Sequence, residues 1–224
     1  MKPRINERCS SGLVNKIIGE VFDSELQALG FQKSTPRKYV RSRIQQTHDV
    51  IELLSQTIQL RFIWGISLQF VPHIEGRSTE TVKWHRTVAS ANPDLRYSET
   101  ENVPNGHVLY NVSTIHGETV LRDEAIRAKS VLLPRANAFF ASVTRLAEIG
   151  DLFVREEQQP RWGSIFNTPQ AALAFAFYLA KVGREVEARR YMSEWLKRSH
   201  QRTETNARLA ELFEDALRTP LIVQ

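Results

Sequence analysis

Large apolar side chains occupy every second position across residues 58–70, and mostly polar residues lie between them. This alternation predicts a β-strand with one buried face, because successive strand side chains point to opposite sides of a sheet. Across residues 13–31 the apolar positions instead recur at steps of three and four, which predicts an amphipathic helix. Ser10 or Ser11 can cap the start of this helix, and Gly30 can end it. We expect the helix to cover the apolar face of the sheet.

The neighbouring segments predict further strands. Residues 37–45 alternate and are typical of a strand that follows a turn at residues 34–36. Residues 50–56 are apolar without a decisive period, so a strand and a helical turn both stay open there. Residues 107–115 alternate again and predict a strand that closes the β part of the protein.

The chain changes character after Gly117. Before it, residues 75–105 are polar and rich in turn signals, which predicts a long loop with one short helix around Trp84. After it, apolar positions have helical spacing in four segments, at residues 131–146, 168–182, 184–199 and 205–217. We predict an α+β fold: an N-terminal helix packed on an antiparallel sheet, followed by a C-terminal helical part. The expected domains are residues 1–118 and residues 119–224.

Composition narrows the class of protein. The 224 residues are 42% apolar and 25% charged, which is typical of a globular protein and argues against disorder or a fibrous repeat. Cys9 is the only cysteine, so the chain can form neither an intrachain disulfide nor a cysteine-rich zinc site. No uncharged run reaches the ~18 residues that a membrane span needs. We expect a cytoplasmic protein without a membrane partner.

The positive charge is concentrated near the N-terminus. Net charge is +5, because 30 Lys and Arg residues stand against 25 Asp and Glu residues. Residues 1–43 hold nine of the bases and four of the acids, an excess of five that equals the whole net charge. A basic segment of this kind can attract nucleic acid or an acidic partner.

Four residues of this segment form the best candidate binding surface, which we call the basic tract. They are Arg37, Tyr39, Arg41 and Arg43. They fall on one face of the predicted strand, and together they can grip phosphates and stack a base. Arg61, on the polar face of the strand at residues 58–70, extends this surface if the two strands are neighbours. The alternative interpretation is an edge strand kept soluble by its charges, because basic residues guard edges against pairing.

Histidines and acids suggest a second kind of site, for a metal ion or for acid–base chemistry. The residues are His73, His85, His107 and His116, with Glu75, Glu80 and Glu118 nearby. Their spacing matches no metal motif such as His-Glu-x-x-His, and the sequence has no nucleophile-elbow, dinucleotide or phosphate-loop signature. We therefore assign no catalytic residue, no metal and no cofactor.

A short series of motifs links the first helix to the strands. Leu-Gly-Phe-x-Lys stands at residues 29–33, Tyr-Val-Arg at residues 39–41, and an apolar segment at residues 50–56. This series, within residues 13–71, resembles a bacterial family known only as a domain of unknown function. The resemblance implies an α+β bacterial protein and supplies no catalytic residues.

Three functional hypotheses follow. The first is a non-enzymatic bacterial binding protein with a protein partner, of accessory or of immunity and defence type. A helical hairpin at residues 171–197 resembles one tetratricopeptide unit, a peptide-binding module, but a repeat of this kind needs neighbouring repeats and only one unit is visible, which favours a plain hairpin packed on the domain. The second is a nucleic-acid-binding module that uses the basic tract. The third is an enzyme of unfamiliar type, which a cleft gathering the histidines would favour.

Overall fold

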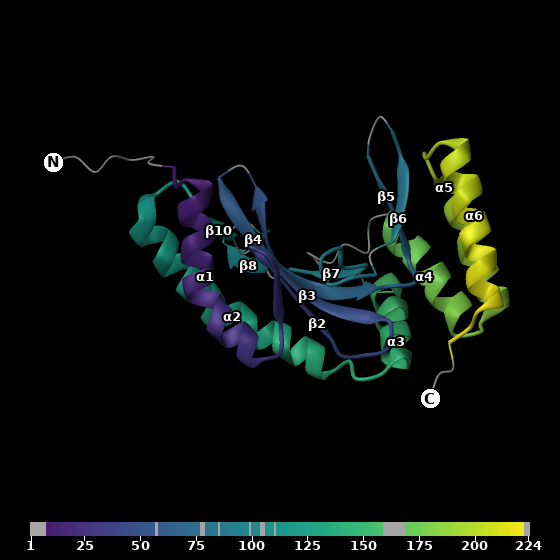
Figure 1. Cartoon of the computed structure of the whole chain (residues 1–224), viewed down its shortest axis with the longest axis horizontal. Coiled ribbons are helices and arrows are strands. Elements are labelled where there is room, and N and C mark those ends of the chain that lie inside the picture. Colours follow the sequence, from purple (N-terminus) through teal and green to yellow (C-terminus); the bar gives the residue numbers. More distant parts are fainter. Residues whose placement is uncertain are drawn as a thin grey trace. The chain divides into compact units, whose positions relative to one another are not determined.

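The protein has an α+β fold, as the sequence predicts, with an N-terminal helix, an antiparallel sheet and then helices (Figure 1). The computed structural model describes residues 8–56, 58–76, 79–84, 86–98, 100–103, 106–109, 111–158 and 169–221. The helices are α1 (Ser11–Ala28), α2 (Gly117–Ala141), α3 (Leu146–Gln158), α4 (Pro169–Lys181), α5 (Glu185–Arg198) and α6 (Thr203–Arg218). None of these described helices has an apolar stretch long enough to cross a bilayer.

The main sheet has the strand order β1-β2-β3-β4-β10, and β7 also pairs with β4. These strands are β1 (Gln32–Thr35), β2 (Lys38–Ser42), β3 (Thr47–Gln56), β4 (Gln59–Leu68), β7 (Leu95–Tyr97) and β10 (Asn111–Ser113). Two separate hairpins consist of β5 (Pro72–Glu75) with β6 (Thr81–Trp84), and of β8 (Thr100–Val103) with β9 (Gly106–Leu109).

The chain divides into two compact units that interleave along the sequence. Unit 1 comprises the described parts of residues 1–41, 49–65 and 97–142, and unit 2 those of residues 42–48, 66–96 and 143–224. The single boundary predicted after residue 118 does not coincide with this division. We describe each unit by itself.

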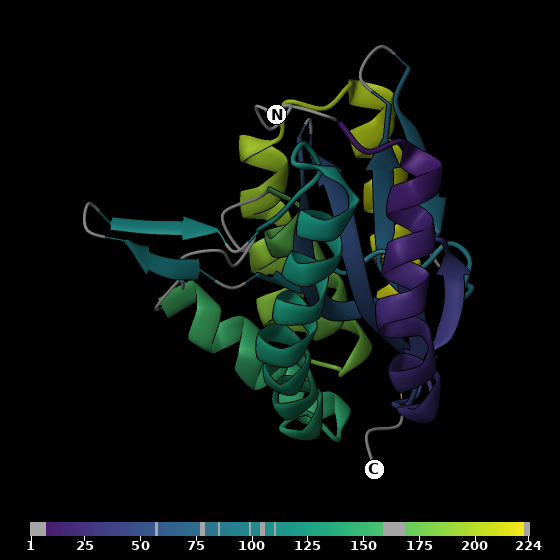
Figure 2. The same ribbon diagram turned by 90° about the vertical axis from the view of Figure 1, so that its left-hand side faces the viewer.

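In unit 1, helices α1 and α2 lie side by side (Figure 2). Helix α1 begins as predicted, because Ser10 Oγ accepts a hydrogen bond from Leu13 N at 3.2 Å, and it ends before Gly30, which has a φ of +83°. Its buried face packs Phe22 against Phe62 of β4, with ring centroids 5.9 Å apart. The predicted cover of the sheet by this helix is confirmed.

Several local predictions need correction. Residues 32–35 form β1, where the sequence predicts the start of a turn, and of the two alternatives left open for residues 50–56 the structure has the strand, as part of β3. The strand predicted at residues 58–70 is shorter, and Ile58 is 46% exposed rather than part of the core. From Phe62 onward both faces of β4 are buried, because Ile63 and Gly65 interrupt its polar face. Strand β4 therefore lacks the open polar face that strict alternation predicts.

The long loop predicted at residues 75–105 contains strands instead. Trp84 ends strand β6 and pairs with Pro72 of β5, so the short helix predicted around it is wrong. The segment Thr81–Trp84 is rich in β-branched and aromatic side chains, which favour a strand over a helix at this length. The strand predicted at residues 107–115 is divided between β9 and β10.

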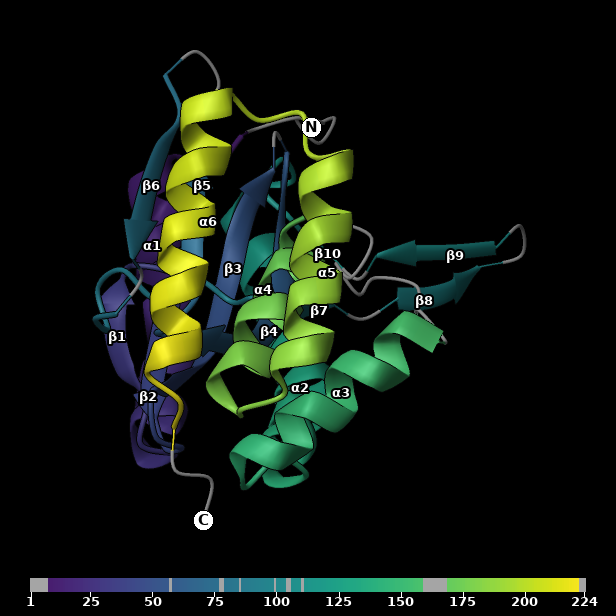
Figure 3. The same ribbon diagram turned by 90° about the vertical axis from the view of Figure 1, so that its right-hand side faces the viewer.

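The C-terminal helices follow their predicted positions closely from residue 169 onward. Helices α4, α5 and α6 each begin and end within two residues of the predicted bounds, and Gly183 with a φ of +77° separates α4 from α5. Helix α2 starts fourteen residues before the predicted residue 131, so Pro134 lies in its interior rather than in a first turn. Figure 3 shows α6 beside β5 and β6, with which it shares unit 2.

Gly150 of α3 packs so closely on Tyr178 of α4 that substitution by alanine is expected to destabilise the protein. A Cβ at Gly150 would lie 2.5 Å from Tyr178 Oη and 2.8 Å from the ring. The tyrosine cannot easily move, because its hydroxyl donates to Leu146 O at 3.0 Å and its ring packs near Phe153.

We expect Gly150→Ala to lower the free energy of unfolding by about 1–3 kcal/mol, although alanine is the better helix former by about 1 kcal/mol. Urea denaturation measures this change. Gly12→Ala in α1 is the matched control, because a Cβ there meets nothing closer than 4.0 Å, and it should hold or raise stability. Equal stability of Gly150→Ala and the unmodified protein would contradict the expected clash.

Candidate ligand pocket

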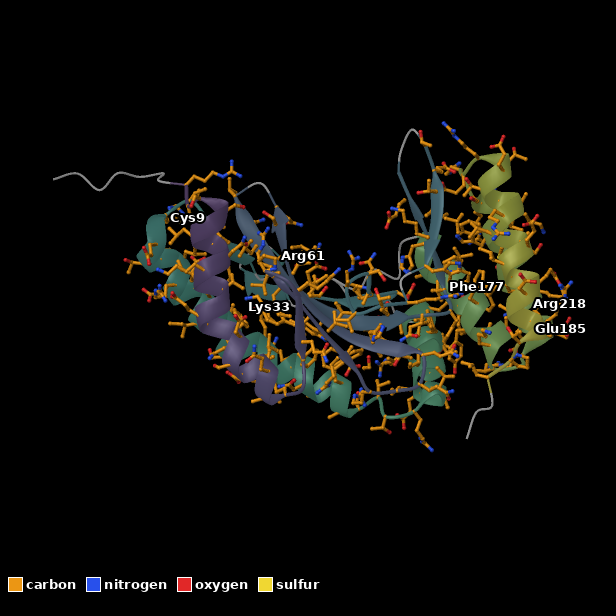
Figure 4. All side chains as sticks on the ribbon, viewed as in Figure 1. Cys9, Lys33, Arg61, Phe177, Glu185 and Arg218 are labelled. Carbon is orange, nitrogen blue, oxygen red and sulfur yellow. The ribbon has the colours of Figure 1, made fainter. Side chains whose placement is uncertain are left out.

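Tyr39 of the basic tract is fully buried and does not offer its ring to a ligand. Its hydroxyl donates to Asp23 Oδ1 of α1 at 2.7 Å. Burial and the hydrogen bond to this carboxylate raise the pKa of Tyr39 far above its usual value. Asp23 also accepts from Lys33 Nζ (Lys33 is labelled in Figure 4), at 2.7 Å from Oδ2. Tyr39 therefore belongs to a polar link between the helix and the sheet.

Arg41 is also held inside unit 1. Its guanidinium donates to Asp49 Oδ2, at 3.1 Å from Nε and 2.8 Å from Nη2, and to Leu29 O at 2.8 Å from Nη1. The same group lies over the ring of Phe31, 4.4 Å from its centroid. The Asp49 side chain is only 1% exposed, so Arg41 supplies the countercharge of a buried carboxylate.

The other basic candidates, Arg37, Arg61 and Arg43, lie in different environments. Arg37 is half-buried and lines a cavity of about 310 Å³ with Cys9 at the start of α1. Arg61 of β4 is half-buried and donates from Nη2 to Ser98 Oγ at 2.9 Å (Figure 4). Arg43 is exposed and belongs to unit 2. The tract therefore does not present its four side chains as one open face.

Two of the predicted histidines lie in different units. His73 is buried in unit 2, with Nε2 3.2 Å from Asp94 Oδ1, and Asp94 Oδ2 accepts from Leu68 N at 2.7 Å. His116 is exposed and precedes α2 in unit 1. His85 and the side chain of His107 lie outside the described residues. No cluster of three or more His, Cys, Asp or Glu side chains suited to a metal occurs in the described part of the chain.

Unit 2 contains a cavity of about 490 Å³ that none of the sequence motifs indicates, and we call it the Trp84 pocket. Two aromatic residues line it, Phe70 and Trp84. The polar lining consists of Gln46, Gln69, Arg86, Lys181, Asp215 and Thr219. These residues come from the β2–β3 connection, the β4–β5 region, the segment at the end of β6, helix α4, and helix α6 with its C-cap residue Thr219.

Two cations of the Trp84 pocket lie near each other. The Arg86 guanidinium stacks over the Trp84 ring, 4.1 Å from its centroid. Lys181 Nζ donates to Thr219 O at 2.6 Å and to Thr219 Oγ1 at 2.8 Å. Partial burial, and then the positive charge of Arg86, lower the pKa of Lys181 below its usual value. Within the described residues, neither cation forms a salt bridge with a carboxylate.

His48, a buried residue that sequence reasoning overlooked, contacts the amide of Gln69 in the pocket lining. His48 Nε2 lies 3.0 Å from Gln69 Nε2 and 3.4 Å from Arg86 O, and Nδ1 lies 2.9 Å from Ser42 Oγ. Gln46 has a φ of +56°, a conformation that is rare for residues other than glycine. Its carbonyl accepts from Gln69 N at 3.0 Å, which helps to fix this backbone.

No family model, no curated protein and no solved structure matches the chain. The chemistry of the pocket must therefore be derived from its own residues. Cations, amides and aromatic rings are the groups with which proteins recognise the charged, polar and flat parts of a ligand.

Proposed function

We propose that the protein is a non-enzymatic binding protein and that its Trp84 pocket holds an anionic group of what it binds. The observation that carries the proposal is the approach of Arg86 to Lys181 in one cavity. Two like charges repel each other, and the partial burial of Lys181 costs it solvation, so an anion bound between Lys181 and the exposed Arg86 relieves both penalties. The two positive charges in the cavity of the free protein therefore favour the binding of an anion.

The donors of both cations suit an oxyanion. An ammonium group has three N–H donors, and Thr219 accepts two hydrogen bonds from Lys181, which leaves one for a ligand. Arg86 stacks on the ring of Trp84, and this contact restrains its guanidinium group. The N–H groups lie in the guanidinium plane, so stacking on one face leaves them able to donate to a ligand. A phosphate or carboxylate can accept from both residues at once.

The proposal is tested with inorganic phosphate on the full-length protein. We expect Lys181→Met to weaken phosphate binding at least tenfold, or about 1.4 kcal/mol, because it removes one charged donor and keeps the length of the side chain. Isothermal titration calorimetry at low salt measures the dissociation constants. Lys197→Met, an exposed lysine of α5, is the charge-matched control and should bind phosphate as the unmodified protein does. Equal loss in both variants would contradict a specific anion site.

The hypotheses of a protein partner and of a nucleic acid remain open beside this proposal. A groove of about 440 Å³ between α5 and α6, lined by Met192, Leu196 and Phe213 among others, supports a protein partner. The nucleic-acid hypothesis now rests on Arg37 and Arg43, because Tyr39 and Arg41 are engaged inside unit 1.

A further inference from the structure

We propose that the ligand of the Trp84 pocket is a nucleotide, with its phosphate at Arg86 and Lys181. This inference rests on the proposed anion site and specifies the rest of the molecule that carries the anion. Three observations support it: the size of the cavity, the presence of a carboxylate in it, and the amide and aromatic groups that complete its lining.

The cavity is larger than an inorganic anion needs. Its volume of about 490 Å³ lies within the range of about 300–1,000 Å³ typical of pockets for drug-sized organic ligands. A phosphate alone would leave most of this space to water. The anion is therefore expected to be one end of a larger polar molecule.

The carboxylate of Asp215 favours a ligand that is not anionic throughout. Asp215 lines the same cavity as the two cations, its backbone carbonyl accepts from Thr219 Oγ1 at 2.9 Å, and its Oδ1 accepts from Arg218 Nη1 at 3.4 Å in an exposed ion pair. A second anionic group near Asp215 would be repelled, whereas sugar hydroxyls can donate hydrogen bonds to its carboxylate. A ligand with a phosphate at one end and hydroxyl groups beside it satisfies both sides of the pocket.

Gln46 and Gln69 supply the remaining recognition chemistry. Each amide carries both donors and an acceptor, the combination that reads the edge of a nucleobase, and Gln69 has one of these groups, Nε2, in contact with His48 Nε2 at 3.0 Å. Gln46 is held at positive φ, and a strained residue that the fold maintains beside a cavity points to a role in binding. The half-buried Trp84, over which Arg86 stacks, provides flat apolar surface for a base, whereas Phe70 is only 4% exposed and offers little of its ring to a ligand.

The test compares ligands that share a phosphate. The four ribonucleoside monophosphates, ribose 5-phosphate and inorganic phosphate are titrated into the full-length protein by calorimetry at one salt concentration. We expect at least one nucleotide to bind tenfold or more tightly than ribose 5-phosphate, and ribose 5-phosphate to bind more tightly than inorganic phosphate. An acidic tripeptide, Glu-Glu-Glu, tests a peptide ligand in the same assay.

Two variants separate the parts of the pocket. Asp215→Ala is expected to weaken nucleotide and ribose 5-phosphate binding several-fold and to leave phosphate binding equal or tighter, because it removes a hydroxyl acceptor and a repelling charge. The Asp215 side chain is 66% exposed, so this variant should fold. Gln46→Gly is expected to reduce the preference for a nucleotide over ribose 5-phosphate, and glycine accepts the positive φ at that position.

The outcomes distinguish the two proposals. If phosphate, ribose 5-phosphate and all nucleotides bind with one affinity that Lys181→Met reduces, the anion site stands and the nucleotide inference is overturned. Tighter binding of the acidic tripeptide than of every nucleotide overturns it as well. If none of the anions binds, both proposals fail.

Discussion

Replacing Arg41 by alanine is expected to lower the free energy of unfolding by about 3–5 kcal/mol. The substitution removes the guanidinium that donates twice to Asp49, whose side chain is 1% exposed. Burying a carboxylate without its countercharge is costly, because the lost solvation is no longer offset. The variant also leaves Leu29 O without its donor and removes the cation stacked on Phe31. Urea denaturation gives the change.

The size of this effect can be assigned to the buried charge with a second variant. Arg41→Ala combined with Asp49→Asn should be more stable than Arg41→Ala alone, because a neutral amide costs less to bury than a carboxylate. Arg198→Ala, the replacement of an exposed arginine in the last turn of α5, should change stability by less than about 1 kcal/mol. A loss below 1 kcal/mol for Arg41→Ala would show that Asp49 does not depend on this arginine.

A test of nucleic-acid binding by the basic tract should leave Arg41 intact, because this residue stabilises the fold. A variant that replaces Arg41 is expected to unfold more easily, so its loss of binding would not identify a contact. Arg37 and Arg43 are the informative positions, because Arg37 is half-buried and Arg43 is exposed, so that each side chain can reach a ligand. Retention of the Arg37→Ala and Arg43→Ala variants on heparin, with Arg41 intact, addresses the hypothesis directly.

Sequence periodicity predicts most of the elements, because an element with one buried face has apolar residues at regular spacing in its own sequence. The spacing of α1 and of α4 to α6 is helical, and each has one buried face or, in α4, almost continuous burial. Periodicity does not predict the burial of a residue whose partners come from distant segments of the chain. Periodicity places Tyr39 and Arg41 correctly in a strand, but their partners Asp23 and Asp49 are identified only by the fold.

The Trp84 pocket could not be predicted for a related reason. Its residues span positions 46–219, and no two of its charged groups stand at a motif spacing. Trp84 and Arg86 lie in a segment whose polar character indicates a loop, and Lys181 ends a helix where a basic residue is expected near the last carbonyls. The signal that was available is the unusual pair of glutamines and the tryptophan in a polar region, which becomes meaningful only when α4 and α6 are placed beside them.

Phe177→Ala is the second substitution with a large expected effect, about 3–5 kcal/mol of unfolding free energy. Phe177 of α4, labelled in Figure 4, is completely buried. Its ring meets Phe213 of α6 edge to face, at 5.7 Å between centroids. Truncation removes the transfer free energy of the ring and leaves a cavity between the two helices. Val186→Ala, at a side chain that is 84% exposed, is the control and should be nearly neutral.

The contact between Phe177 and Phe213 also supports the Trp84 pocket, since α4 carries Lys181 one helical turn after Phe177 and α6 carries Asp215. The milder Phe177→Leu is expected to cost about 1–1.5 kcal/mol and to keep the protein folded. If this core contact fixes the two helices at the pocket, Phe177→Leu should weaken phosphate binding several-fold although it removes no lining atom, because small displacements of the donors reduce their hydrogen bonds to an anion. Unchanged phosphate affinity in a destabilised Phe177→Leu protein would show instead that Lys181 is positioned by Thr219 alone.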